Sequence, residues 1–135
     1  MTKMKTQYLG GLRTEIEHIQ SGCKIITDAP LDNHGKGESF SPTDMFTASL
    51  GSCMLTIMGI AAETHGFSID GATMDIEKIM GTEPRRVVEI KIDAYFPNGK
   101  NYTDREKRFI EAAAKTCPVM NSLHPEIVKS ITFNY

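Results

Sequence analysis

The sequence predicts a single α+β domain over residues 1–135, and three observations support that prediction. Apolar and polar side chains alternate at both ends of the chain and in a pair of segments between them, which predicts β-strands. Two other segments, 41–65 and 103–117, repeat apolar residues at helical spacing. The strands come in groups separated by helices, an order that is typical of an α+β architecture. A chain of this length can bury one hydrophobic core.

The N-terminal segment is the first predicted strand region. Residues 6–18 alternate between apolar and polar side chains, and the glycine pair at 10–11 within them predicts a β-bulge. A turn at residues 21–22 leads into a second strand at 23–27, its hairpin partner. We expect Cys23 to be a core residue of this second strand.

A loop and a long helix follow. Residues 29–40 are dense in turn formers and predict a connector. Ser41 is a typical N-cap, Pro42 fits the first helical position, and Asp44 completes a variant capping box. Gly66 is a plausible stop, so the helix should end at about residue 64 or 65.

The middle of this long helix is apolar on nearly all sides. Such a helix should be central and buried, yet a 135-residue chain has little material to wrap it. We therefore expect a homodimer in which a second subunit covers one side. The apolar side chains are Met45, Phe46, Leu50, Met54, Ile57, Met58 and Ile60.

Two further alternating segments predict a long antiparallel hairpin. Residues 82–85 form a natural turn between the strands, and Pro-Asn-Gly at 97–99 ends the hairpin. The predicted core face comprises Ala72, Met74 and Ile76 on one strand and Val88, Ile90, Ile92, Ala94 and Phe96 on the other.

A second helix and a last strand complete the chain. Thr103 and Glu106 form a capping box, and the helical stripe that follows places Cys117 toward the core. Pro118 prevents simple continuation of this helix but suits the start of a new short one. Residues 130–135 alternate and predict a terminal strand.

Composition argues against several classes of function. A net charge of -2 and an isoelectric point near 6.1 give no electrostatic reason to bind nucleic acid. We find no signal peptide and no uninterrupted 18-residue apolar run, so we expect a cytoplasmic protein without a membrane span. The chain has neither Cys-x-x-Cys nor His-x-x-x-His, and we expect no metal and no cofactor.

Cysteine is the candidate for chemistry. In a reducing compartment three cysteines indicate reactive or buried thiols rather than a disulfide framework. Cys53 lies within the long apolar helix and Cys117 near the end of the second, so the two meet only if these helices pack together. If Cys53 and Cys117 are in contact, the pair can cycle between two thiols and a disulfide. The alternative is that each simply fills the core, as free cysteine usually does.

A reactive Cys53 would need a cation beside it. Burial in apolar surroundings raises the pKa of a thiol and makes it less reactive. An arginine at about 4 Å contributes roughly 4 kcal/mol at an effective dielectric of about 20, or about three pK units, against which the cost of burial must be set. A different reading pairs a cysteine with His124 as a Cys–His acyl-transfer enzyme, although no orienting acid or oxyanion hole is evident.

Two segments carry a resemblance to a known family. Residues 41–53, Ser-Pro-Thr-Asp-Met-Phe-Thr-Ala-Ser-Leu-Gly-Ser-Cys, and residues 116–123, Thr-Cys-Pro-Val-Met-Asn-Ser-Leu, resemble the OsmC/Ohr family of small thiol-dependent hydroperoxide reductases. The resemblance implies an intertwined α+β homodimer whose antiparallel sheets wrap around long central helices. It also implies sites at the subunit interface.

The resemblance also implies roles for particular residues. Cys53 matches the peroxidatic cysteine and Cys117 the resolving cysteine, and their disulfide would be reduced by an external dithiol, in one branch protein-bound lipoyl. Arg13, after the glycine pair, matches the activating arginine. The glutamate that holds this arginine in the peroxidase branches is here Thr43, with Asp44 beside it. The departure points to a general OsmC-like branch.

The sequence thus predicts a cysteine-based peroxidase that reduces organic hydroperoxides in oxidative stress defence. The alternative, from a different class of function, is a stress-associated or ligand-binding protein that keeps the fold and the cysteines but has little peroxidase activity. The hydroperoxide, the reductant and the position of Arg13 relative to Cys53 do not follow from the sequence.

Overall fold

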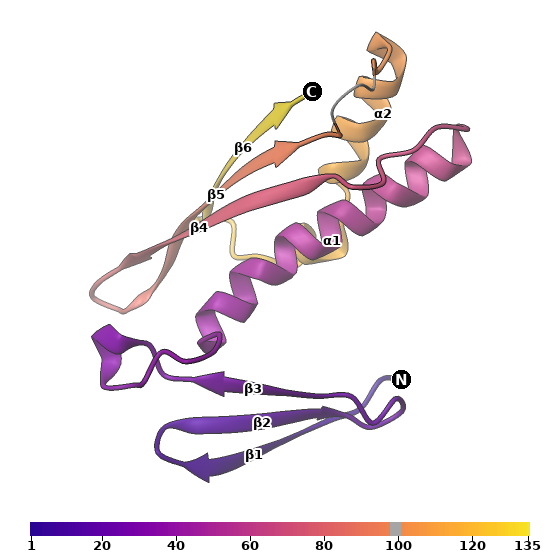
Figure 1. The fold of residues 1–135 in the computed structure, drawn as a ribbon. Coiled ribbons are helices and arrows are strands. Elements are labelled where there is room, and N and C mark those ends of the chain that lie inside the picture. Colours follow the sequence, from indigo (N-terminus) through magenta and orange to yellow (C-terminus); the bar gives the residue numbers. More distant parts are fainter. Residues whose placement is uncertain (98–100) are drawn as a thin grey trace. The chain divides into compact units, whose positions relative to one another are not determined.

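The computed structural model describes residues 1–97 and 101–135 and shows the predicted α+β fold (Figure 1). It contains two three-stranded sheets. The chain divides into two compact units, residues 1–46 and 47–135.

The N-terminal unit is built on an antiparallel sheet in the order β1-β2-β3. Its strands are β1 (Met4–Gly10), β2 (Arg13–His18) and β3 (Lys24–Asp28). The predicted loop after β3 is confirmed and holds only the short 3-10 helix η1 (Leu31–Asn33).

Two predictions in this unit were wrong. Residues 6–18 are not one strand, because the backbone at Gly10, Gly11 and Leu12 takes φ angles of 86°, 61° and 63° and reverses the chain into a hairpin. Such angles favour glycine, which has no Cβ to clash. A register irregularity does occur there, between Tyr8 and Gly10. Cys23 is exposed at the turn before β3 rather than in a core.

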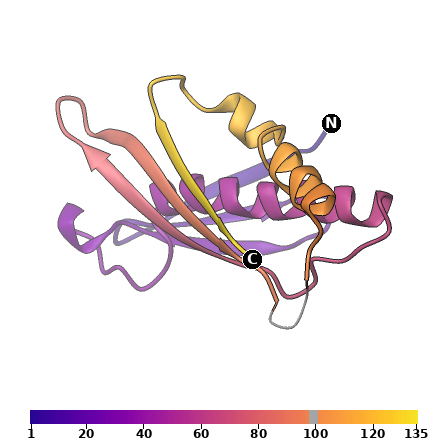
Figure 2. The same cartoon turned by 90° about the horizontal axis from the view of Figure 1, so that it is seen from above.

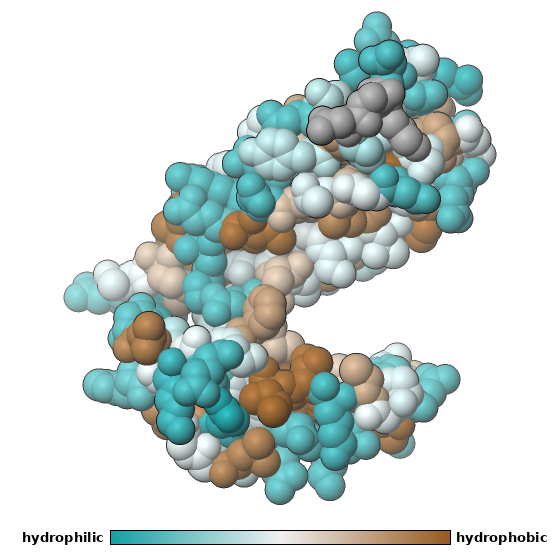
Figure 3. Space-filling view, viewed as in Figure 1, coloured by the Kyte–Doolittle hydropathy of each residue, from teal (hydrophilic) through white to brown (hydrophobic). Residues whose placement is uncertain are grey.

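The N-terminal unit buries no hydrophobic side chain among its own residues. Its buried residues are all polar: Thr27, Asp28 and Ser41. Figure 3 shows hydrophobic patches on the surface of this sheet. The exposed large hydrophobic residues on the three strands are Met4, Tyr8, Leu9, Ile25 and Ile26.

Helix α1 (Pro42–Thr64) begins as its capping residues predict. The backbone N–H of Asp44 donates to Ser41 Oγ at 3.0 Å, and the Asp44 carboxylate accepts the N–H of Ser41 at 2.9 Å. This reciprocal pair satisfies two donors that a helix start leaves without partners. The helix ends where Gly66 takes a φ of 77°.

The second sheet is mixed, in the order β4-β5-β6 (Figure 2). Its strands are β4 (Thr73–Gly81), β5 (Arg86–Tyr95) and β6 (Val128–Asn134). The β4–β5 hairpin is antiparallel as predicted, and β6 pairs with β5 in parallel. An irregularity between Ile79 and Met80 shifts the register, so Val87 rather than Val88 joins the core.

Helix α1 is buried along one stripe and not all round. Leu50, Met54 and Met58 are fully buried in the core that includes Ile90 and Ile92 of β5. Other apolar side chains of α1 stay exposed in the single chain, among them Phe46 and Ile60. This agrees with the expectation that one chain has too little material to wrap the helix, and cover by a second subunit stays a prediction. By length and hydropathy α1 would also suffice to cross a membrane, but its buried stripe identifies a core helix.

Two helices follow the hairpin. Helix α2 (Asp104–Ala114) starts at the predicted capping box of Thr103 and Glu106, and the short α3 (Pro118–Ser122) starts at the predicted proline. The proposed hairpin end at 97–99 falls partly on residues 98–100, which lie outside the described residues.

Candidate functional site

The two cysteines singled out by the sequence occupy different environments in unit 47–135. Cys53 lies in the middle of α1 and is half-buried. Cys117 is fully buried, with 0% of its surface exposed. It does not lie within α2, which ends at Ala114, but is the N-cap of α3.

The Cys53 and Cys117 side chains are neighbours, close enough for Cys53 to raise the pKa of the Cys117 thiol. Both thiols are free in this structure. The sequence left open whether the two helical segments meet, and the core that joins α1 to the α2–α3 region brings them together. The pair therefore has the contact that an exchange between dithiol and disulfide requires.

Burial is the main influence on the Cys117 thiol and raises its pKa. The neighbouring Cys53 side chain also raises the pKa of Cys117. The backbone N–H of Met120 donates to Cys117 Sγ at 3.2 Å and partly opposes the rise, as does the N–H of Val119. Burial prevails because an apolar surrounding disfavours the thiolate, so Cys117 is a protonated thiol at neutral pH.

Arg13 is held by two carboxylates within unit 1–46. Its Nε donates to Asp28 Oδ1 at 2.7 Å and its Nη2 to Asp28 Oδ2 at 3.0 Å, a side-on bidentate pair. Nη2 also donates to Glu38 at 3.1 Å. The arginine hydrogen bonds are the main reason why the pKa of Asp28 is lowered. An action of Arg13 on Cys53 stays a prediction.

Asp28 and Glu38 were missed by the sequence reasoning. Arg13 and Asp28 are direct cross-strand partners of β2 and β3. Asp28 lies one residue beyond the second strand predicted at 23–27, so its pairing with Arg13 became readable only with the register of β2 and β3. Glu38 comes from a loop, where no periodicity places a side chain.

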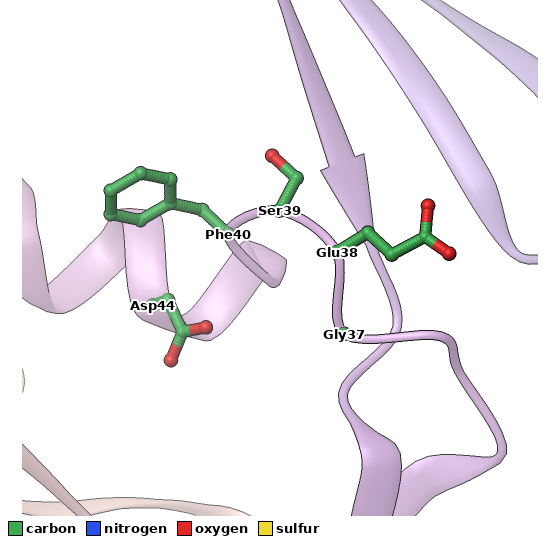
Figure 4. Close-up of a pocket in the computed structure, with 5 residues that line it drawn as sticks. All are labelled: Gly37, Glu38, Ser39, Phe40 and Asp44. Carbon is green, nitrogen blue, oxygen red and sulfur yellow. The ribbon is translucent and has the colours of Figure 1, made fainter.

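An open hollow of about 390 Å³ lies before α1 and is lined by Glu38 and Asp44 (Figure 4). The Glu38 side chain points away from Asp44. Asp44 contributes to the cap described above, which accounts for an acid at this position. Gly37, Ser39 and Phe40 complete the lining.

The geometry gives little support to a reaction based on histidine or on a bound metal ion. His124 Nδ1 lies 3.4 Å from Arg86 Nη2 and accepts the N–H of Glu126 at 3.1 Å. In residues 1–97 and 101–135 neither Cys53 nor Cys117 has a histidine partner, and no group of three metal-ligating side chains occurs. The acyl-transfer reading therefore lacks its base.

Comparisons with known proteins agree with this fold. The family model described as OsmC-like protein matches residues 35–132. A hydroperoxide reductase from Mycoplasma genitalium is 26% identical over 117 residues, which span 82% of this chain and 79% of that protein.

Solved structures extend the likeness to nearly the whole chain. A Psychrobacter arcticus protein named for osmotic stress induction and detoxification response is 46% identical with a TM-score of 0.93, covering 99% of this chain and 96% of its own. A Legionella pneumophila organic hydroperoxide resistance protein shares the fold at 17% identity, with a TM-score of 0.79 and coverages of 100% and 97%.

Proposed function

Because the chain belongs to the OsmC-like protein family, we propose that it is a thiol-dependent peroxidase that reduces organic hydroperoxides to alcohols. The observation that carries the proposal is the contact between Cys53 and Cys117. The M. genitalium relative, named hydroperoxide reductase, supports a peroxide-related role.

The two cysteines take different parts in the proposed cycle. Cys53 is half-buried and has access to substrate, whereas Cys117 is fully buried and does not. The Cys53 thiolate attacks the outer oxygen of the hydroperoxide, the O–O bond breaks, and the leaving alkoxide takes up a proton to become the alcohol. Cys53 is left as a sulfenic acid.

Cys117 then resolves this intermediate. Its sulfur attacks the Cys53 sulfur, the S–S bond forms, and the hydroxyl group leaves as water with the proton of Cys117. The existing contact means that little movement precedes this step. An external dithiol, for which protein-bound lipoyl is the leading candidate, returns two electrons by exchange and restores both thiols.

Arg13 is the proposed activator of Cys53. A guanidinium favours the thiolate over the thiol electrostatically and always carries its charge. Asp28 and Glu38 raise the pKa of Arg13 further.

The proposed working form is a cytoplasmic homodimer. A three-stranded sheet needs a covered hydrophobic face to be stable, and unit 1–46 buries no hydrophobic side chain. Exposed apolar residues on α1, such as Ile60, offer matching surface on a second copy. A reducing cytoplasm would keep the resting thiols free.

The test is consumption of cumene hydroperoxide and hydrogen peroxide with dihydrolipoamide as reductant. We expect preference for the organic substrate, loss of turnover in Cys53→Ser, and loss of the intramolecular disulfide in Cys117→Ser. Cys23→Ser is the matched control, because Cys23 is exposed and lies in the other unit. Fully reduced wild-type protein that consumes neither peroxide would refute the proposal and favour a ligand-binding protein.

A further inference from the structure

The two thiols of the candidate site differ in how far solvent can reach them. Cys117 belongs to the buried core together with Ile110 and Leu123, and none of its surface is exposed. Cys53 is only packed against that core and keeps part of its surface open. A disulfide between them would therefore offer one accessible sulfur and one enclosed sulfur to an external thiol.

The backbone around Cys117 holds its sulfur in this enclosed position. A proline restricts the residue before it to extended backbone, and Cys117, which precedes Pro118, has a ψ of 140°. Its carbonyl oxygen accepts the N–H of Asn121 at 3.2 Å, and its Sγ accepts the N–H of Met120 at 3.2 Å. Exposing Cys117 would disrupt the start of α3, so this sulfur is fixed as well as covered.

The geometry of thiol–disulfide exchange makes this difference in access decisive. A thiolate attacks one sulfur of a disulfide from the side opposite the sulfur that leaves. Attack on Cys117 would require space for the incoming thiol behind an atom that is surrounded by core residues. Attack on Cys53 takes place at a residue that is already partly open.

We propose that the external dithiol attacks the sulfur of Cys53, so that the covalent intermediate of regeneration is a mixed disulfide at Cys53 and Cys117 is the leaving group. The thiolate of the dithiol bonds to Cys53 as the Cys53–Cys117 bond breaks, and Cys117 leaves with the electron pair and takes up a proton. The second thiol of the dithiol then attacks the dithiol sulfur of the mixed disulfide and releases Cys53 as a thiolate. The inference deepens the proposed function, since it rests on the Cys53–Cys117 disulfide.

The acidity of the leaving thiol acts against this assignment. A sulfur leaves faster when its thiol has a lower pKa, and burial raises the pKa of Cys117. The backbone N–H groups of Met120 and Val119 act against that rise and would receive the departing negative charge. Access prevails because a higher pKa only slows the departure of Cys117, whereas an enclosed sulfur is closed to the attacking thiol.

The experiment uses the whole chain with Cys23→Ser, which removes the exposed third thiol, after diamide has formed the Cys53–Cys117 disulfide. Glutathione is added as a monothiol, the reaction is quenched with acid, and the unfolded protein is alkylated with N-ethylmaleimide. Peptide mass spectrometry then locates both groups. We expect glutathione on Cys53 and N-ethylmaleimide on Cys117, in roughly tenfold excess over the reverse pattern.

The same oxidised protein treated with glutathione in urea is the matched control, because unfolding opens both sulfurs. There the two patterns should occur in comparable amounts. Equal labelling of the folded protein, or glutathione mainly on Cys117, would overturn the proposal. Failure of diamide to join Cys53 to Cys117 would refute both this assignment and the proposed cycle. A protein that carries glutathione on Cys53 but consumes no peroxide would refute the peroxidase and leave the assignment standing.

Discussion

Cys117 combines two roles at one sulfur atom. It is the proposed resolving thiol, and its Sγ also accepts the N–H of Met120 to cap α3. Serine, threonine and aspartate are the usual caps. Here the cap is a buried cysteine, so the candidate redox group also fixes the start of α3. Burial at 0% exposure raises the pKa of this thiol and shields it from solvent.

The raised pKa of Cys117 predicts a loss of stability in alkali. An unfolded thiol ionises near pH 8.5, whereas the folded thiol holds its proton to higher pH. Its contribution to stability is present below about pH 8.5 and is lost as the pH rises toward the folded pKa. Urea unfolding of the reduced protein at pH 7 and pH 10 measures this effect.

Cys117→Ser should lose less stability than wild type between these two pH values. Cys23→Ser, which removes an exposed thiol, is the control and should behave as wild type does. Equal losses in all three proteins would contradict the prediction.

At the scale of elements, the contact between α1 and the second sheet depends on a residue without a side chain, Gly51. A Cβ atom at Gly51 would overlap Ile76 Cδ1 of β4 and lie 3.4 Å from Ile76 Cγ1. Glycine in a helix interior costs about 1 kcal/mol relative to alanine, so its place in α1 is explained by this close packing and not by helix propensity.

Gly51→Ala should therefore destabilise the protein. Overpacking costs about 1–3 kcal/mol and outweighs the gain in propensity of about 1 kcal/mol. Ile76→Val removes the overlapping Cδ1 atom, so in that background Gly51→Ala should become neutral or stabilising. Chemical denaturation of the two single variants and the double variant measures the coupling. Additive effects would show that Ile76 is not the obstacle.

The elements were largely predictable because their signals are local. The caps at Ser41 and Thr103, the proline at 118 and the alternation of β4 and β5 each act within a few residues. The errors arose where a local sequence pattern is compatible with two different backbone structures. A glycine pair suits both a bulge and a tight turn, and only the pairing of β1 with β2 distinguishes them.

Some features of the candidate site were predictable from the sequence and others were not. Cys53 and Cys117 were identified from their helical contexts, but their contact depends on tertiary packing that periodicity cannot supply. Asp28 required the register of β2 with β3. The irregularity between Ile79 and Met80, which turned Val87 inward, left no mark in the alternation.

At the scale of the whole molecule, the N-terminal sheet is the strongest argument for a partner subunit. Tyr8, Ile16 and Ile25 lie on one face by strand alternation, whereas Ile26 shares the other face with Glu15. The apolar face is the one that a second copy would cover, since an uncovered patch of this kind usually marks an interface.

A charge on that face should prevent dimer formation. We expect Ile25→Asp to be monomeric or aggregated, because burying an unpaired carboxylate in an interface is costly. Ile26→Asp should remain dimeric, although both isoleucines are similarly exposed, at 44% and 42%. Analytical ultracentrifugation distinguishes the two outcomes. A monomeric wild type, or a dimer that tolerates Ile25→Asp, would contradict this assignment.

The sulfur cap of α3 also gives the protein a natural spectroscopic reporter. The amide proton of Met120 points at the atom that would become half of a disulfide. Its NMR resonance and its exchange with deuterated solvent should therefore follow the proposed redox cycle without an added dye. The rate at which any candidate electron donor restores the two thiols can be read at a single backbone position.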